Sequence, residues 1–273
     1  MNKIICLIDY TRKSENALQY AANLALDTSS KLILVSLQHQ RARRRALIFA
    51  GEGEQDYHPS RLPEMCDQLR SMWKIRCDFS EVSSLNMEEL ATQLGPDIQM
   101  MVVGIESSTR PSPYRDLTAI DFKMIRESSI PIVLVPENFE YHRVTRMLYA
   151  YDYRNDSTAP VEQLRQLSEW LKSDIRVLTV AQKEYSPEED ERIEKRIDQF
   201  RKQWKGTRAI SFDYIYYEDV AKCLDHYVDL WRKDDMMVFS ISPVPLTKRL
   251  FHKSIIKEIT LCCDYPVMIL HRN

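Results

Sequence analysis

Short apolar runs alternate along the chain with segments whose apolar residues recur every three or four positions. Apolar runs of this length are typical of buried strands, and the three-to-four spacing is typical of helices that bury one face. In the first half, strands are predicted at Lys3–Ile8, Lys31–Leu37, Ile75–Val82, Gln99–Gly104 and Ile130–Val135. Helices are predicted after a cap at Ser14 and over about 61–73, 87–94 and 115–128, with a loop over 39–60.

The second half repeats this order of elements. Strands are predicted at Arg146–Tyr151, Ile175–Val180, Ile210–Tyr217, Met236–Ser240 and Pro266–Leu270. Helices are predicted from Pro160 to about Lys172, from Ser186 onward, over Val220–Arg232 and over about 251–263. Pro160 suits a first helical turn because proline has no N–H to leave unpaired there.

Three pairs of segments show that the two halves are copies. Leu-Ile-Asp at 7–9 parallels Ala-Tyr-Asp at 150–152, and Met-Met-Val-Val-Gly at 100–104 parallels Met-Met-Val-Phe-Ser at 236–240. Ile-Pro-Ile-Val-Leu at 130–134 parallels Tyr-Pro-Val-Met-Ile at 265–269. A repeat of this length predicts two duplicated domains, at 1–138 and 143–273, joined by a linker at about Glu137–Arg143.

Strands that alternate with helices predict a doubly wound α/β fold, with a parallel sheet covered by helices on both faces. Such sheets bind ligands beyond the carboxyl ends of their strands, at the point where the strand order reverses. The loops after the first and fourth strands of each half are therefore the expected ligand sites.

Composition narrows the function classes. The 273 residues have a formal net charge of -2, which gives no general attraction for nucleic acid or an anionic membrane. An arginine run at 41–45 is followed closely by glutamates and has no aromatic platform, so no nucleic acid is expected as a partner. No apolar run is long enough to span a membrane, and the apolar start is too short for a signal peptide. We therefore expect a cytoplasmic protein with no membrane partner.

Neither the cysteines nor the histidines show the spacing of a metal site, and no catalytic constellation is visible. There is no Walker loop and no nucleophile elbow. Most of the six cysteines are expected to pack as small apolar side chains, although the adjacent Cys262 and Cys263 leave redox chemistry open. The sequence thus predicts neither a metal nor an enzyme.

At the expected ligand edge the chain resembles the universal stress protein family. Asp9 followed by Ala17-Leu18-Gln19-Tyr20-Ala21-Ala22 is similar to the opening of such a domain. Ser129-Ile130-Pro131-Ile132-Val133 and Asp264-Tyr265-Pro266-Val267 are similar to its ending, in both halves. The resemblance implies two five-stranded sheets of the adenine nucleotide alpha hydrolase type, with strand order 3-2-1-4-5.

Nucleotide-binding members of that family carry a phosphate loop of Gly, two residues, Gly, nine residues, then Gly-Ser or Gly-Thr. Its glycines let backbone N–H groups approach phosphates at a helix N-terminus. In the first half Gly104 matches the first glycine, Ser107 replaces the second, and Thr118 stands at the final pair. The resemblance therefore leaves binding of ATP or another adenine nucleotide open for this half. The missing glycines argue against tight binding.

The second half departs further from the phosphate loop. Ser240 and Pro243 replace the first two glycines, and Lys253-Ser254 stands at the last pair. Pro243 has no N–H to donate to a phosphate. Lys253 and Ser254 near the start of the last helix predict either an anion site without glycine or a solvated basic surface.

Both halves keep an aspartate after their first strand, Asp9 and Asp152. In nucleotide-binding relatives this carboxylate faces the adenosine. It can equally order the loop or cap the helix without any ligand, and the sequence leaves both interpretations open.

The leading interpretation is a stress-response binding or interaction module without the full ATP-binding loop. The alternatives are an adenine-nucleotide sensor that uses the first half and, more weakly, a slow nucleotide hydrolase. Family members pair through their last strands, so the two halves are expected to pair within the chain. A homodimer and an unidentified protein partner stay open.

Overall fold

The computed structural model describes residues 1–37, 61–82, 87–106, 125, 128, 130–154, 160–181, 185–231, 236–241 and 265–271. Contacts among the residues of the chain divide it into two units. The first begins at Met1 and closes at Tyr141, and the second continues from His142. This division lies within the segment expected as a linker, although the predicted domain limits of 1–138 and 143–273 stay a prediction.

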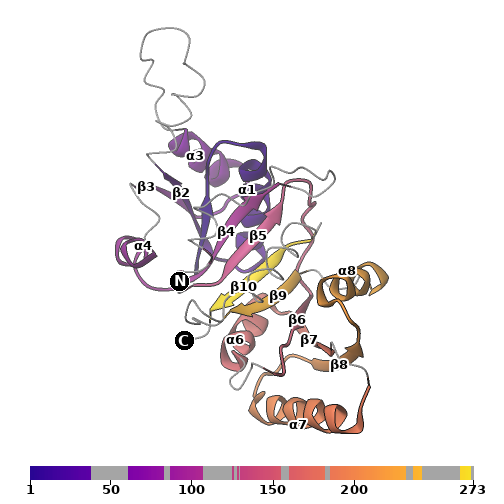
Figure 1. The fold of residues 1–273 in the computed structure, drawn as a ribbon. Helices are drawn as coiled ribbons and strands as arrows, with labels where there is room; N and C mark the ends of the chain where they lie inside the picture. The colour runs from indigo at the N-terminus through magenta and orange to yellow at the C-terminus, as the bar shows by residue number, and fades with distance from the viewer. Residues whose placement is uncertain are drawn as a thin grey trace. The chain divides into compact units, whose positions relative to one another are not determined.

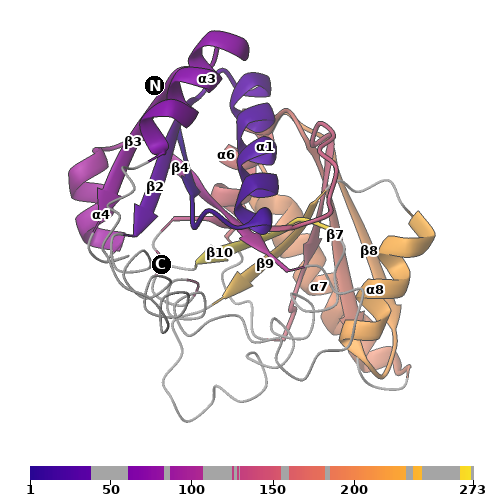
Figure 2. The ribbon, with the colours of Figure 1, turned by 90° about the horizontal axis from the view of Figure 1, so that it is seen from above.

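The first unit is a parallel sheet flanked by helices (Figure 1). Its strands follow the order β3-β2-β1-β4-β5. Right-handed crossovers place α1 and α3 on one face of this sheet and α4 on the other (Figure 2). Its elements are β1 (Lys3–Leu7), α1 (Arg12–Asp27), β2 (Lys31–Leu37), α3 (Leu62–Met72), β3 (Cys77–Val82), α4 (Met87–Leu94), β4 (Ile98–Ile105) and β5 (Ile132–Pro136).

The second unit repeats this topology with the strand order β8-β7-β6-β9-β10. In Figure 1, α7 and α8 lie on opposite sides of β8. Its elements are β6 (Arg146–Ala150), α6 (Val161–Leu171), β7 (Asp174–Ala181), α7 (Pro187–Gln203), β8 (Ile210–Tyr216), α8 (Val220–Trp231), β9 (Met236–Ile241) and β10 (Val267–His271). In both units the order corresponds to 3-2-1-4-5, so the predicted fold class is confirmed.

The central strands are apolar at consecutive positions because helices cover both faces of each sheet. Ile4, Ile5 and Cys6 of β1 have no exposed surface. In the second unit Phe200 of α7 packs its ring against Tyr151 after β6, with ring centroids 5.5 Å apart. These contacts form the core that fixes the strand ends where ligands are expected.

Several element bounds differ from those predicted. β1 ends at Leu7, so Asp9 stands two residues beyond the strand. Pro160 is the N-cap of α6 and not a residue of its first turn. The loop predicted over 39–60 and the helix predicted over 251–263 lie outside the described residues, as does nearly all of the helix predicted over 115–128.

The start of the predicted linker is fixed onto α1. The Asn16 side-chain amide donates to the carbonyl oxygens of Pro136 at 2.7 Å and Phe139 at 3.0 Å. The ring of Tyr141 stacks edge-on against Tyr20 at 5.0 Å, and its hydroxyl donates to Asp27 at 2.6 Å. The aromatic residues Phe139 and Tyr141 of this segment thus pack against Tyr20 of the first unit, which its interpretation as a linker did not predict.

Within the described part of the chain, none of the helices combines the length and apolarity that crossing a membrane requires.

Candidate functional site at the carboxyl ends of the strands

Asp9 orders the turn between β1 and α1. Its Oδ1 accepts a hydrogen bond from the backbone N–H of Thr11 at 3.0 Å, and the Thr11 hydroxyl donates to the same oxygen. Tyr10, between them, adopts a left-handed conformation with φ 61°. The carboxylate compensates for this strained backbone by binding the residue that follows it. Asp9 thus has a structural role that needs no ligand.

Thr11, and not Ser14, is the N-cap of α1. The Thr11 hydroxyl accepts from the backbone N–H of Ser14, and the Ser14 hydroxyl lies 3.1 Å from the backbone nitrogen of Thr11. This reciprocal pair is a capping box, with Ser14 at its third helical position. The sequence placed the cap three residues too late because either hydroxyl can serve as an N-cap.

Asp9 is held in its ionised form. Burial opposes ionisation, but hydrogen bonds from the Thr11 and Ser14 side chains outweigh it and lower the pKa of Asp9 below its ordinary value. Lys13 adds a favourable charge. The positive end of the α1 dipole acts in the same direction. The first unit therefore carries a carboxylate anion at its expected ligand edge.

Gly104 lies directly beneath the first turn of α1. A Cβ atom at this position would stand 2.1 Å from the carbonyl oxygen of Lys13 and 3.0 Å from the nitrogen of Ser14. Both are backbone atoms, so they cannot move aside as a side chain can. Gly104 is thus required for close packing of β4 on α1, and it is brought next to the turn that Asp9 orders.

Ser240 occupies the position in the second unit that Gly104 occupies in the first. Gly104 pairs with Val135, four residues after Pro131, and Ser240 pairs with Leu270, four residues after Pro266. The Ser240 hydroxyl lies 2.8 Å from the Tyr149 hydroxyl of β6. In the first unit the backbone of α1 packs closely on Gly104. In the second unit, the side chains of Tyr149 and Ser240 connect β6 and β9 at the equivalent position.

Asp152 repeats the turn made by Asp9, in a different setting. Its Oδ1 accepts from the backbone N–H of Arg154 at 3.2 Å, again two residues on. The next helix among the described residues, α6, begins at Val161. The equivalence of the two aspartates therefore extends to this turn.

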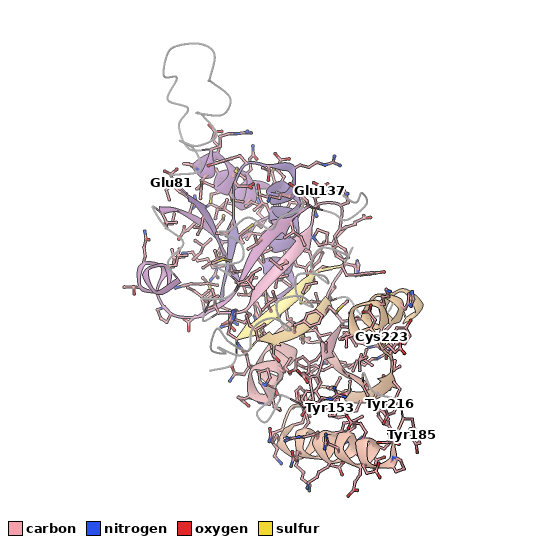
Figure 3. The ribbon with its side chains drawn as sticks, viewed as in Figure 1. Glu81, Glu137, Tyr153, Tyr185, Tyr216 and Cys223 are labelled. Atoms are coloured by element: carbon pink, nitrogen blue, oxygen red, sulfur yellow. The ribbon has the colours of Figure 1, made fainter. Side chains whose placement is uncertain are left out.

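The Tyr153 side chain, directly after Asp152, lies beside α7 (Figure 3). The Tyr153 hydroxyl donates to Glu189 Oε1, and Arg154 Nη2 binds the same oxygen at 3.0 Å. Burial, and then the Glu189 carboxylate, raises the pKa of Tyr153 to about 12. Tyr216 at the end of β8 donates to the neighbouring Asp190 at 2.7 Å.

The Tyr153–Arg154–Glu189 cluster was missed in the sequence because its members lie far apart along the chain. The sequence does show Glu189 three residues after Ser186, which is the N-cap of α7. The Ser186 hydroxyl accepts a hydrogen bond from the Glu189 backbone N–H. That pattern indicates a capping box, in which the glutamate would bind its own helix end. The structure instead gives the Glu189 side chain to Tyr153 and Arg154.

The other predicted site residues lie outside the described residues: Ser107, Thr118, Lys253 and Ser254. Of the predicted set, the structure brings Gly104 to the turn of Asp9, and it shows Asp152 and Ser240 in separate hydrogen bonds. A search of the described residues for three or more side chains arranged around a metal ion finds no such group.

A shallow hollow of about 480 Å³ lies at the opposite, amino-terminal ends of β2 and β3. Lys31, Arg70, Lys74 and Arg76 line it, together with Cys77 and Asp78. The sequence analysis did not consider this end of the sheet, because ligands of parallel sheets are expected at the other end.

No family model and no curated protein matches the sequence. Solved structures do match it. A universal stress protein from Archaeoglobus fulgidus is 10% identical with a TM-score of 0.66, covering 100% of this chain and 99% of that one. A putative universal stress protein from Pseudomonas aeruginosa is 14% identical with a TM-score of 0.61, covering 99% and 93%.

The cytoplasmic domain of a prokaryotic cation chloride cotransporter also matches, at 9% identity and a TM-score of 0.53, covering 98% of this chain and 94% of that one. One fold thus occurs in proteins with different names and settings, and at this identity it does not determine activity. From its topology and these likenesses, the chain has the fold of the universal stress proteins, in two tandem units.

Proposed function

We propose that the chain is a cytoplasmic universal stress protein that acts as a binding or interaction module in a stress response, and not as an enzyme. The observation that carries this proposal is that the site residues described in the two units serve the fold. Asp9 and Asp152 order their own turns, and Gly104 accommodates the backbone of α1. These structural roles explain why the three residues are present without a bound nucleotide.

The second unit supports this proposal most strongly. Tyr153 is 2% exposed and Tyr151 is 5% exposed, so aromatic side chains fill the region after β6. Arg154 is bound to Glu189 and to the Tyr153 hydroxyl, at 2.9 Å from its Nε. A nucleotide that follows the family's pose would have to displace these contacts. We therefore expect this unit not to bind ATP in that pose.

Native mass spectrometry of the freshly purified chain tests the proposal. We expect the bare mass of 32.2 kDa, with no ATP, ADP or other adenine nucleotide retained. The alternative, an adenine-nucleotide sensor in the first unit, is favoured by the ionised Asp9 beside Gly104, since a carboxylate there can accept ribose hydroxyl bonds. A nucleotide that co-purifies with the unsubstituted chain but not with the Asp9→Asn variant would establish this alternative. That result would overturn the proposal of an interaction module without a nucleotide.

A nucleotide hydrolase is the weakest alternative. Phosphoryl transfer depends mainly on positioning and charge stabilisation around the phosphates. Ser107 stands where the family pattern has its second glycine, and a side chain there limits how closely the backbone N–H groups can approach a phosphate. Phosphate release above background from added ATP by the purified chain would count in favour of the hydrolase.

The two units are proposed to pair with each other through their last strands, β5 and β10. Each is the last strand in the order of its own unit and is mainly apolar in sequence, Ile-Val-Leu-Val-Pro and Val-Met-Ile-Leu-His. An apolar edge strand left unpaired promotes aggregation, and covalent linkage raises the effective concentration of the partner unit. A homodimer and a separate protein partner remain further proposals.

Small-angle scattering tests this pairing. A compact particle of the chain's length is expected to have a radius of gyration of about 19 Å. A scattering curve of two separated, non-contacting bodies would rule out the internal pair, and a doubled mass at the same concentration would indicate the homodimer.

A further inference from the structure

Cys66 and Cys77 form a close pair of thiols in the first unit. Their Sγ atoms are 2.9 Å apart, and both are free and buried, with Cys66 0% and Cys77 3% exposed. Cys66 lies within α3 and Cys77 is the first residue of β3. A disulfide requires a separation of about 2.05 Å, so a shift of less than about 1 Å would join them.

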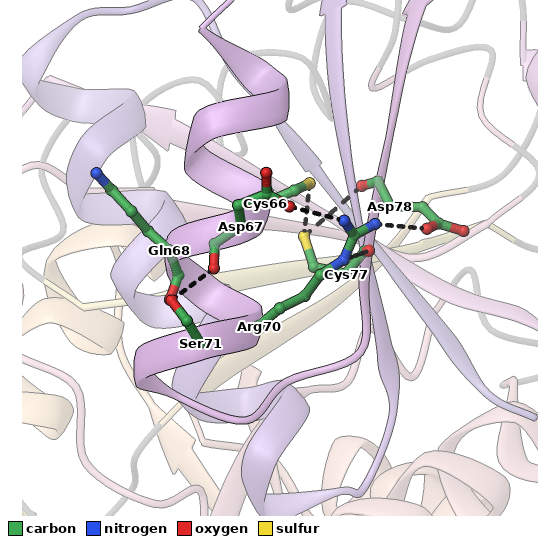
Figure 4. Close-up of polar contacts among 7 residues, drawn as sticks. All are labelled: Cys66, Asp67, Gln68, Arg70, Ser71, Cys77 and Asp78. Carbon is green, nitrogen blue, oxygen red and sulfur yellow. Dashed lines mark hydrogen bonds and ion pairs between the residues drawn. The ribbon is translucent and has the colours of Figure 1, made fainter.

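The charge of Arg70 is held beside this pair (Figure 4). Its Nε donates to the carbonyl oxygen of Cys77 at 2.8 Å, while Nη1 and Nη2 bind Asp67 at 2.9 Å and Asp78 at 3.1 Å. The guanidinium is thus fixed one helical turn after Cys66. A fixed positive charge next to a thiol favours its thiolate, the form that reacts with oxidants.

The two thiols are unequal. The hydrogen bond from Cys77 lowers the pKa of Cys66 against the opposing effect of burial, and the positive charge of Arg70 assists against the opposing charges of Asp78 and Asp67. The same hydrogen bond and burial raise the pKa of Cys77. Cys66 is therefore the group that ionises first, and Cys77 keeps its proton.

One member of this pair, Cys77, borders a hollow that is open to solvent. Cys77 and Arg70 both belong to the wall of the 480 Å³ hollow at the amino ends of β2 and β3. The thiols themselves are too buried for a bulky disulfide such as oxidised glutathione. A peroxide of the size of two water molecules fits this hollow, and a small local opening beside Cys77 would bring it to Cys66.

We propose that Cys66 and Cys77 are a redox-active dithiol that a small peroxide oxidises to an intramolecular disulfide. The Cys66 thiolate attacks one oxygen of hydrogen peroxide, the O–O bond breaks, and the departing hydroxide is protonated to water. Cys66 is then a sulfenic acid. Cys77 sulfur attacks Cys66 sulfur, the S–O bond breaks, and hydroxide leaves with the Cys77 proton as a second water.

The sum of these steps is two thiols and one hydrogen peroxide giving one disulfide and two waters. A small dithiol reductant such as dithiothreitol reverses it by exchange. The bond would connect α3 to β3 across an 11-residue separation in sequence. In a reducing compartment the pair is reduced at rest, so its oxidation reports the presence of peroxide. This inference does not depend on the proposed function.

Peptide mapping of the intact chain tests the proposal. The reduced protein is treated with hydrogen peroxide, denatured, alkylated with iodoacetamide and digested with trypsin. We expect the peptide Leu62–Arg70 to be linked to the peptide that begins at Cys77, and dithiothreitol to release both. Closing this loop is also expected to raise Tm by about 6 °C without reductant.

Matched variants identify the source of the effect. Cys66→Ala and Cys77→Ala should each abolish the link and the rise in Tm. Cys223→Ala should keep both, because Cys223 is equally buried and burial raises its pKa. Arg70→Gln should slow the reaction about fivefold, and Arg70→Lys should restore most of the rate.

Three results would overturn the proposal. These are full alkylation of both peptides after peroxide treatment, conversion of Cys66 to a sulfinic acid without a link, and a link that forms only in urea. If an alanine variant does not fold, mapping of the unsubstituted chain still decides the question, because it needs no substitution.

Discussion

Replacing Gly104 with alanine is expected to lower the free energy of unfolding by about 3 kcal/mol, a fall in Tm of roughly 10 °C. The added methyl carbon would stand 2.1 Å from the carbonyl oxygen of Lys13 and 2.5 Å from its carbonyl carbon. Relief requires α1 to move away from β4. That movement would also disturb the capping box of Thr11 and Ser14, which stands on the same turn.

Calorimetry of the intact chain measures this effect, and Ser240→Ala is the matched control. That substitution is at the equivalent strand position of the second unit, adds no atom, and removes the contact with Tyr149. It is expected to cost about 1 kcal/mol. Equal losses in the two variants, or an unchanged Tm in Gly104→Ala, would show that α1 does not approach β4 as closely as described.

The fold could be predicted because its signals are local and repeated. Apolar runs such as Met100–Gly104 identify buried strands by themselves, and the matching run at 236–240 shows the duplication. The strand order came from the family resemblance, and the right-handed rule for crossovers is consistent with it. The predicted ends of the elements were less accurate. At the start of α1, for example, Thr11 and Ser14 both carry hydroxyls that suit an N-cap.

The chemistry of the site could be predicted only in part. Asp9 and Gly104 were found because a known pattern points to them, but the sequence could not show that each serves the adjacent turn. That depends on how closely α1 approaches β4. Pairs such as Cys66 with Cys77 depend on how a helix packs on a strand, and no spacing rule for cysteines describes it.

Glu189 is expected to contribute about 2 kcal/mol to the stability of the second unit. Its side chain is buried, at 5% exposed for the residue, and it binds Tyr153 and Arg154, with Arg192 at 3.5 Å. Removal of the carboxylate would leave the Tyr153 hydroxyl and the Arg154 guanidinium without their acceptor. Part of the cost is recovered by water, because the Arg154 side chain is 32% exposed.

The same contacts make this contribution depend on pH. The hydrogen bond from Tyr153, aided by Arg154, lowers the pKa of Glu189 in the folded chain from its ordinary value of 4.5, against the opposing effect of burial. A carboxyl with a lowered folded pKa binds fewer protons than in the unfolded chain. Its stabilisation is therefore complete well above pH 4.5 and is lost as the pH falls through the folded pKa.

Glu189→Ala is compared with Glu188→Ala by denaturant unfolding at pH 7 and at successively lower pH. Glu188 is exposed and also lies in the first turn of α7, so both variants lose the same favourable charge at the helix N-terminus. At pH 7 we expect a loss of about 2 kcal/mol for Glu189→Ala and at most about 0.5 kcal/mol for Glu188→Ala. The difference between them should shrink as the solution becomes more acidic. A difference that is absent at pH 7, or that grows on acidification, would mean that Glu189 does not act as an ionised acceptor for Tyr153 and Arg154.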